Sequence, residues 1–168
     1  MTTPILLLIL LTAPYLFARL LASAGRSGPD PNAAAAVGLG LVFLFTASGH
    51  FVQTEPMVQM LPAWVPGRVP LVYLTGVLEI AIAIGFFIPR LRRLAGLSAV
   101  AVLILFFPAN IHAALNQVPM GGHAWGPVYL LVRAPVQLIL VAWAWWFTQR
   151  RAVKRGSPLG RRAGAARS

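Results

Sequence analysis

The chain has 168 residues, of which 58% are hydrophobic and 10% are charged, and its formal net charge is +11. Soluble domains average about 25% charged residues, so this composition excludes a water-exposed globular surface and predicts an integral membrane protein. The chain contains no cysteine, which excludes thiol catalysis, thiolate metal sites and cysteine-held iron–sulfur clusters within it.

The first apolar run covers 4–24 and is long enough to cross a bilayer as a helix. Residues 22–24, Ala-Ser-Ala, resemble a signal-peptidase site, but positive charge follows the run instead of preceding it. We therefore predict an uncleaved N-terminal span. The turn-rich linker 25–32 follows, with Asn32 as the expected N-cap of the next helix. We expect residues 1–32 to form one span and its linker.

Four more apolar runs predict an all-α membrane helix bundle with five spans in total. The loop 52–70 contains four prolines, which exclude one continuous helix there. The loop 116–126 carries two glycines and His123, which we expect to be solvated. The predicted second to fifth spans are 33–51, 71–88, 94–115 and 127–147.

The basic residues orient these spans. Of the 14 Lys and Arg residues, seven follow Thr148 and three flank the turn at 90–93. Cytoplasmic loops are enriched in such residues, so the N-terminus is predicted outside and the C-terminus inside. The segment 149–168 is predicted to be a disordered cytoplasmic tail. No nucleic-acid partner is predicted, because no recognition motif accompanies the charge.

Glu79 lies near the middle of the third predicted span. An acidic group at that depth costs roughly 2.5–3.5 kcal/mol on insertion scales, so it needs a partner, a water-filled cavity or a bound proton. Arg133 in the last predicted span is the simplest partner for it. Such a buried pair needs further hydrogen bonds, which Asn110, Gln137 and Tyr73 can supply.

Helical depth places the polar groups of the spans in the same half of the membrane. At about 1.5 Å per residue, they all fall in the outer half of the predicted bundle, on four helices, with Trp64 at the headgroup level of an outer loop. The groups within the spans are His50, Glu79, Asn110, His112, Arg133 and Gln137. Each alone would be unfavourable in lipid, which favours a shared polar cluster.

This cluster allows more than one interpretation. It can be a structural clamp that fixes the register of the helices, or a cavity that binds a ligand or performs catalysis. His50, Glu79 and His112 are candidate acid/base groups, and two histidines with one carboxylate can also hold a metal. Glu79 would then have to leave Arg133, so we assign no metal site. The sequence identifies no cofactor.

Four stretches resemble the DoxX-like family of small bacterial membrane proteins. They occur in family order between residues 37 and 147, and Phe-Pro-Ala-Asn is the most specific phrase. The stretches are Gly49–Phe51, Tyr73–Ile80, Phe107–His112 and Arg133–Gln137. The resemblance implies a four-helix core at 33–148, preceded here by one extra span.

The resemblance also implies a setting and a function. We expect a multi-pass protein of the bacterial cytoplasmic (inner) membrane that binds a lipophilic small molecule, such as a quinone or an isoprenoid. Catalytic candidates are His50, Glu79 and His112. Its partners are expected to be lipid and either a redox enzyme, of which it would be a subunit, or further copies of itself. The alternatives are a membrane enzyme of proton-transfer or metal-assisted redox chemistry and a non-catalytic scaffold. Candidate ligand-binding residues are Tyr73, Trp64, Asn110, Arg133 and Gln137.

Overall fold

The computed structural model describes residues 2–149, and these residues form helices and no strand. Five of the helices are long and apolar enough to cross a membrane. The predicted all-α, multi-pass architecture is therefore confirmed. The elements in chain order are α1 (Thr2–Ser23), α2 (Pro31–Val52), α3 (Thr54–Gln59), α4 (Arg68–Phe87), α5 (Arg92–Leu115), η1 (His123–Tyr129) and α6 (Leu130–Thr148).

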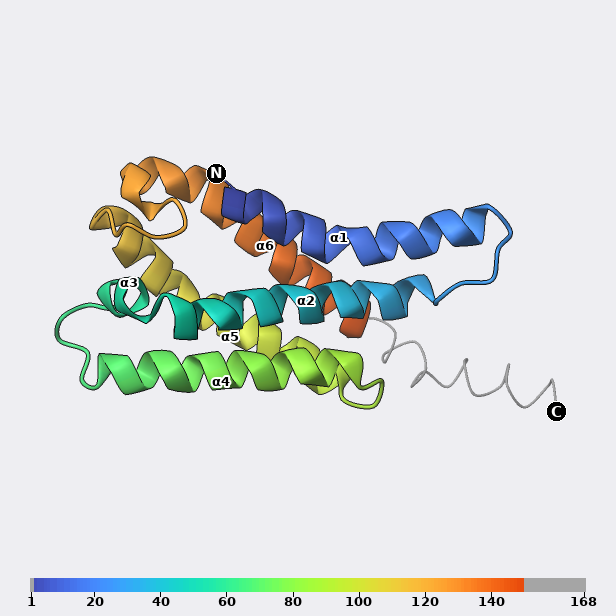
Figure 1. Cartoon of the computed structure of the whole chain (residues 1–168), viewed down its shortest axis with the longest axis horizontal. Coiled ribbons are helices and arrows are strands. Elements are labelled where there is room, and N and C mark those ends of the chain that lie inside the picture. The colour runs from blue at the N-terminus through green and yellow to red at the C-terminus, as the bar shows by residue number, and fades with distance from the viewer. Residues whose placement is uncertain (1, 150–168) are drawn as a thin grey trace.

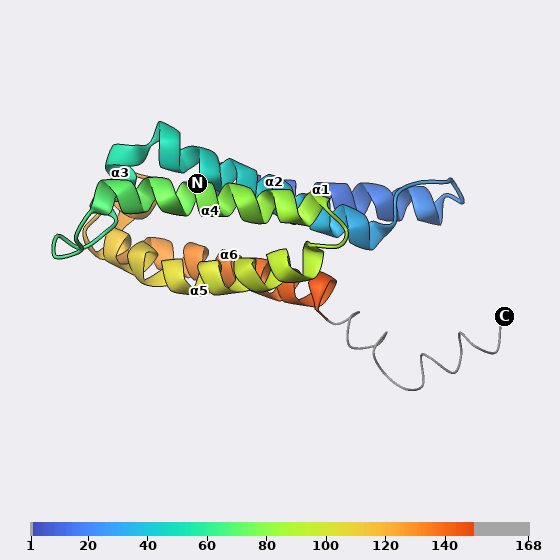
Figure 2. The same ribbon diagram turned by 90° about the horizontal axis from the view of Figure 1, so that it is seen from below.

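The five long helices run roughly along one axis, and successive helices point in opposite directions (Figure 1). The view turned by 90° shows α2 and α4 in one layer and α5 and α6 in the other (Figure 2). The short elements α3 and η1 gather at one end of the bundle, which we call the α3 end. The linker between α1 and α2 lies at the opposite end, where α4 also turns into α5.

The start of α2 differs by two residues from the expected N-cap. Asp30, and not Asn32, caps the helix, because its side chain accepts a hydrogen bond from the backbone N–H of Ala33 at 3.2 Å. Pro31 occupies the first helical position, where its missing N–H would have no partner in any case. Asn32 instead donates to the Asp30 carboxylate at 2.9 Å.

Close packing of α1 on α2 depends on Gly38. A Cβ atom at this position would lie 2.2 Å from the backbone carbonyl oxygen of Leu11. The two helix backbones can approach this closely only where the residue is small. Beside this crossing, Leu11, Leu39 and Phe43 are almost completely buried and join the apolar core that all five long helices share.

Two segments depart from the predicted boundaries. The last span begins with the 3-10 helix η1 before α6, and Gly126 lies between its turns at φ 72°. At the other end of α6, Gln149 is buried and donates to the backbone carbonyl of Arg93 at 2.8 Å. Gln149 therefore packs on the bundle, while the rest of the predicted tail lies outside the described residues.

Candidate functional site

A cavity of about 530 Å³ lies at the α3 end of the bundle. All five long helices contribute to its wall, together with α3 and η1, and most of the lining side chains are apolar. Ligand sites in proteins commonly have volumes of about 300–1,000 Å³ and combine an apolar wall with a few polar groups. Five of the predicted site residues line it, namely His50, Glu79, Asn110, Arg133 and Gln137.

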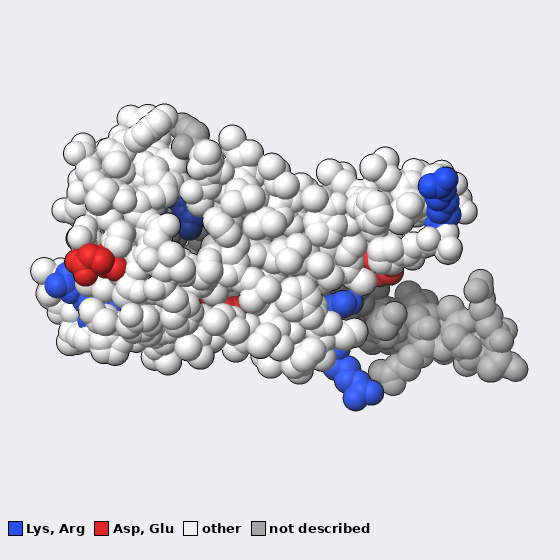
Figure 3. Space-filling view, viewed as in Figure 1, with Lys and Arg blue, Asp and Glu red and all other residues white. Residues whose placement is uncertain are grey.

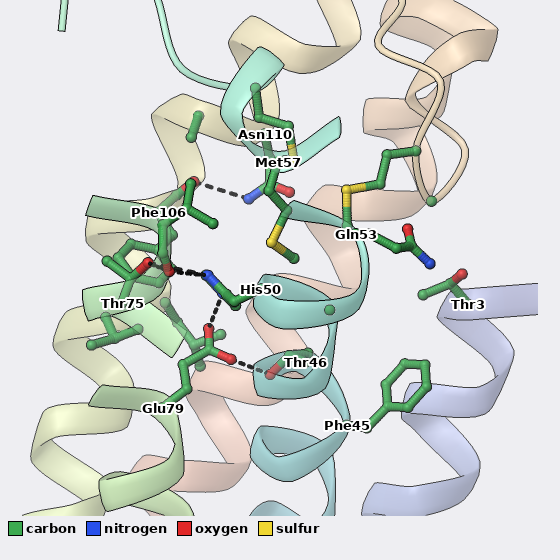
Figure 4. Close-up of a pocket in the computed structure, with 18 of the residues that line it drawn as sticks. Thr3, Phe45, Thr46, His50, Gln53, Met57, Thr75, Glu79, Phe106 and Asn110 are labelled. Atoms are coloured by element: carbon green, nitrogen blue, oxygen red, sulfur yellow. Dashed lines mark hydrogen bonds and ion pairs between the residues drawn. The ribbon is translucent and has the colours of Figure 1, made fainter. Parts of the chain in front are cut away.

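Glu79 is held by α2 (Figure 4). Its Oε1 atom lies 3.6 Å from Nε2 of His50, and its Oε2 accepts a hydrogen bond from the Thr46 hydroxyl at 2.6 Å. His50 and Glu79 are both buried, with 8% and 6% of their surface exposed. Within residues 2–149, the ion pair of Glu79 is formed with His50 and not with Arg133. The expected direct Glu79–Arg133 pair is therefore wrong.

The opposite ring nitrogen of His50 determines where its proton lies. Nδ1 is 2.8 Å from the backbone carbonyl oxygen of Val72, which can only accept, so Nδ1 carries a hydrogen. The Thr75 hydroxyl is also near, at 3.1 Å, and it already donates to backbone carbonyls of its own helix. In the neutral ring, Nε2 would then face Glu79 with a lone pair. The Nε2 side of the ring therefore faces the Glu79 carboxylate, 3.6 Å away.

Gly76 allows this arrangement, because it lies where α4 packs against the His50 side chain of α2. A Cβ atom at Gly76 would lie 2.7 Å from the Cβ atom of His50. Gly76 is one turn before Glu79 on the same helix face, as residues three apart are. The small residue lets α4 approach α2 until the imidazole and the carboxylate meet.

Arg133 is held from a different helix. Its Nε donates to Oδ1 of Asn110 at 3.0 Å, and the Asn110 amide nitrogen donates to the carbonyl of Phe106 at 2.9 Å. The second bond fixes the Asn110 amide so that its oxygen faces Arg133. No residue within 2–149 accepts a hydrogen bond from the terminal nitrogens of Arg133, which remain accessible from the cavity.

Gln137 lies one turn further along α6 on the same face as Arg133. Its amide nitrogen donates to the backbone carbonyl of Leu103 in α5. Its Oε1 atom is buried and has no hydrogen-bond partner among the described residues. Since a buried acceptor without a donor is unfavourable, this oxygen adds to the polar groups that a bound molecule can satisfy after a small rearrangement.

His123 is a cavity residue that the sequence did not indicate. We expected it to be solvated, but it is 4% exposed and lines the cavity. Its Nδ1 lies 2.7 Å from the carbonyl of Met120, and its ring packs edge-to-face on Tyr129 with centroids 4.9 Å apart. Its Nε2 is buried with no partner within residues 2–149. The preceding residues, Gly121 and Gly122, both adopt positive φ and turn the loop inward.

Three predicted site residues do not line this cavity. His112 lies near the carbonyl of Met60, at 3.1 Å, and lines a separate cavity of about 370 Å³ together with Arg68. Tyr73 is 43% exposed and packs on Phe51 at the outside of the bundle. Trp64 is 82% exposed in the loop before α4.

The hypothetical metal set does not assemble. His50 and Glu79 line the larger cavity, whereas His112 lines the smaller one. In the part of the chain that the structure describes, no three His, Cys, Asp or Glu side chains lie close enough to hold one metal ion. The geometry leaves the His50–Glu79 pair as the acid/base candidates of the larger cavity and Arg133 as its hydrogen-bond donor.

Comparisons with known proteins give a family without an assigned activity. No curated protein and no solved structure matches the chain. One family model does match, over residues 39–148, which is well over half of the chain. The match begins within α2, so it includes most of the cavity wall and leaves out α1. The chain belongs to the family described as a domain of unknown function, DUF8561.

Proposed function

We propose that this protein is a membrane-embedded binder of a lipophilic small molecule, a quinone or an isoprenoid, and that the cavity at the α3 end is its binding site. The observation that carries the proposal is the position of this cavity of about 530 Å³ between helices suited to a membrane. Its apolar wall suits a hydrocarbon tail or ring. Its polar groups are few and convergent, as expected for orienting a head group.

The proposed setting follows the distribution of charge. The turn at 90–93 and the segment after Thr148 carry most of the basic residues, so the positive-inside rule places that end of the bundle in the cytoplasm. The α3 end with its cavity then opens towards the outside of a bacterial inner membrane. The likeness to DoxX-like proteins supports this setting and a role as a subunit of a redox enzyme.

Two matched variants on α5 test the binding proposal. Ala109 lines the cavity, so Ala109→Phe fills part of it, whereas Ala101 is exposed outside it. We expect wild-type protein and Ala101→Phe to copurify with a quinone or an isoprenoid in a mild detergent, and Ala109→Phe to lose most of it. Glu79→Gln should also change the bound lipid. Mass spectrometry of the extracted lipids gives the measurement.

The control for folding is the thermal unfolding midpoint of each variant in the same detergent. The proposal fails if well-folded Ala109→Phe, Glu79→Gln and wild-type protein carry the same lipids and none of them is a quinone or an isoprenoid.

A proton-transfer enzyme is the second candidate, and the His50–Glu79 pair favours it. Its two side chains lie 3.6 Å apart in the cavity wall. It could remove a proton from a carbon acid on one side of a ligand and return it elsewhere, which is general acid–base catalysis. His112 has no part in this version, because it lies at the other cavity.

Deuterium uptake tests this second candidate. Purified protein is incubated in D₂O with the ligand that it copurifies with, and mass spectrometry follows deuterium at carbon positions of that ligand. Catalysis predicts incorporation with wild-type protein and at least about a tenfold slower rate with Glu79→Gln. Equal incorporation with and without protein would leave binding as the function.

A further inference from the structure

Within residues 2–149, no carboxylate forms an ion pair with the guanidinium of Arg133. A guanidinium has five N–H donors and no acceptor, and its hydrogen bond within residues 2–149 uses Nε on a neutral amide, Asn110. The nearest acidic candidate, Glu79, is engaged by His50 and Thr46. A charge in a low-dielectric site is strongly unfavourable without an opposite charge and further hydrogen bonds. Glu79 acts on this cation through its charge but does not touch it, so the cavity offers a cation with free hydrogen-bond donors.

The terminal nitrogens of Arg133 favour one class of ligand group. Its terminal nitrogens are accessible from the cavity and have no acceptor among the described residues. Two parallel N–H groups of a guanidinium match the paired oxygens of a carboxylate or phosphate. A neutral carbonyl, as in a quinone, would accept one such bond but would not balance the charge. The preferred head group is thus an oxyanion.

The side of the bundle is hollowed at the α3 end. In Figure 1, α1 and α2 lie closer together at the linker end than at the α3 end, and α6 passes behind them. The space-filling view shows a hollow in this lateral face, near the end of α2, with a basic side chain at its bottom (Figure 3). Arg133 is the described basic residue that lines the cavity.

The residues beside the opening come from both helices. Figure 4 shows Phe45 of α2 and Gln53, the residue that follows α2, turned towards Thr3 at the start of α1. All three also line the cavity. The flank of a membrane-spanning bundle faces lipid, so a molecule with an apolar tail can reach this opening from the bilayer.

The geometry points to an acidic amphiphile as the ligand, a molecule with a carboxylate or phosphate head on an apolar tail. It would slide from the bilayer between α1 and α2 and place its oxyanion on Arg133. This inference rests on the proposed binding function and narrows its ligand class. It also assigns a role to α1, which lies outside the family match and forms one side of the opening.

Calorimetric titration of the full chain in a neutral detergent tests the head group. The probes are two matched pairs, farnesyl phosphate with farnesol and oleate with oleyl alcohol, together with ubiquinone-2 and inorganic phosphate. We expect at least one acid to bind about tenfold or more tightly than its alcohol, since charged hydrogen bonds are strong. Inorganic phosphate alone should bind weakly, which separates a membrane-borne acid from a soluble anion.

Arg133→Gln should lower the affinity for the acid to about that for the alcohol. Arg68→Gln is the matched control, because Arg68 lines the other cavity and should not affect either ligand. Equal affinity for acid and alcohol, or a preference that survives Arg133→Gln, would overturn the inference. Binding of ubiquinone-2 or farnesol without acid preference would leave the proposed function standing, whereas no binding of any probe would defeat both.

The route is tested in the same protein, which has no native cysteine. Thr3→Cys with Gln53→Cys, bridged by a short reducible crosslinker, should slow uptake of the preferred acid from vesicles several-fold, and reduction should restore it. Thr3→Cys alone, treated in the same way, is the control for labelling. An uptake rate that the bridge does not change would exclude the opening between α1 and α2 as the route.

Discussion

Glu79 of α4 is paired with His50 of α2, with Oε1 and Nε2 3.6 Å apart, and not with the arginine of α6. The pair joins two neighbouring helices of one layer. Thr46 adds a second bond from α2 to the same carboxylate at 2.6 Å. These contacts make the polar part of the α2–α4 interface, and Arg133 is left to face the cavity.

The His50–Glu79 pair should give measurable coupling in a double-mutant cycle. His50→Asn keeps a donor near the Val72 carbonyl but removes Nε2, and Glu79→Gln removes the charge. Each change should lower the free energy of unfolding by about 1–2 kcal/mol, and their coupling should exceed about 0.5 kcal/mol. Unfolding in mixed detergent gives the values. Glu79→Gln combined with His112→Asn is the control and should be additive.

Exchanging the charges of residues 79 and 133 should not restore the protein. Arg at 79 would meet the His50 ring and the Thr46 hydroxyl, and Glu at 133 would face the amide oxygen of Asn110. We expect the double variant Glu79→Arg/Arg133→Glu to give no more folded protein in size-exclusion chromatography than the weaker single variant. Recovery to the wild-type level would instead favour the scaffold interpretation, in which these two charges clamp the bundle.

Packing of α1 on α2 can be tested with two glycines of one helix. A Cβ at Gly38 meets the Leu11 backbone at 2.2 Å, whereas a Cβ at Gly40 meets the tip of the Phe87 side chain at 2.7 Å. Alanine favours the helix by up to about 1 kcal/mol at both. We expect Gly38→Ala to lower the unfolding midpoint, since overpacking against a backbone costs about 1–3 kcal/mol. Gly40→Ala should be close to neutral, and equal effects would contradict the tight crossing.

The two histidines that the sequence grouped together should behave differently. His50 lines the larger cavity and His112 the smaller one. His50→Asn should therefore reduce the copurified ligand several-fold, as measured by mass spectrometry, while His112→Asn leaves it at the wild-type level. Equal losses from both variants would place a common site between the two cavities, contrary to this arrangement.

The sequence alone predicted the five spans, because length and hydropathy are enough to identify a membrane-spanning helix. It also placed five of the cavity residues in the same half of the bundle, since depth along a helix follows from counting residues. It did not determine rotation about the helix axis. Asn110 faces the cavity, and His112, two residues later at about 100° per residue, points to nearly the opposite side. Tyr73 lies six residues from Glu79 and leaves the buried face for the same reason.

The partner of Glu79 and the position of His123 could not be predicted either, because both depend on how the folded backbone packs. The choice of His50 over Arg133 as partner of Glu79 depends on the close approach at Gly76, which is a property of two packed helices. The burial of His123 depends on the backbone conformations of Gly121 and Gly122. A glycine permits such a conformation but does not prescribe it, so the sequence could not decide between a solvated and an inward loop.

The contact between Gly38 and the Leu11 backbone has a mechanical consequence. Where two helix backbones are in direct contact, sliding one helix along the other would bring side chains into steric clash. This contact is therefore a point about which α1 can change its angle to α2. A tilt of α1 about this contact would displace its end near Thr3 more than Leu11 itself. The width of the opening beside Thr3 would thus depend on the angle between α1 and α2.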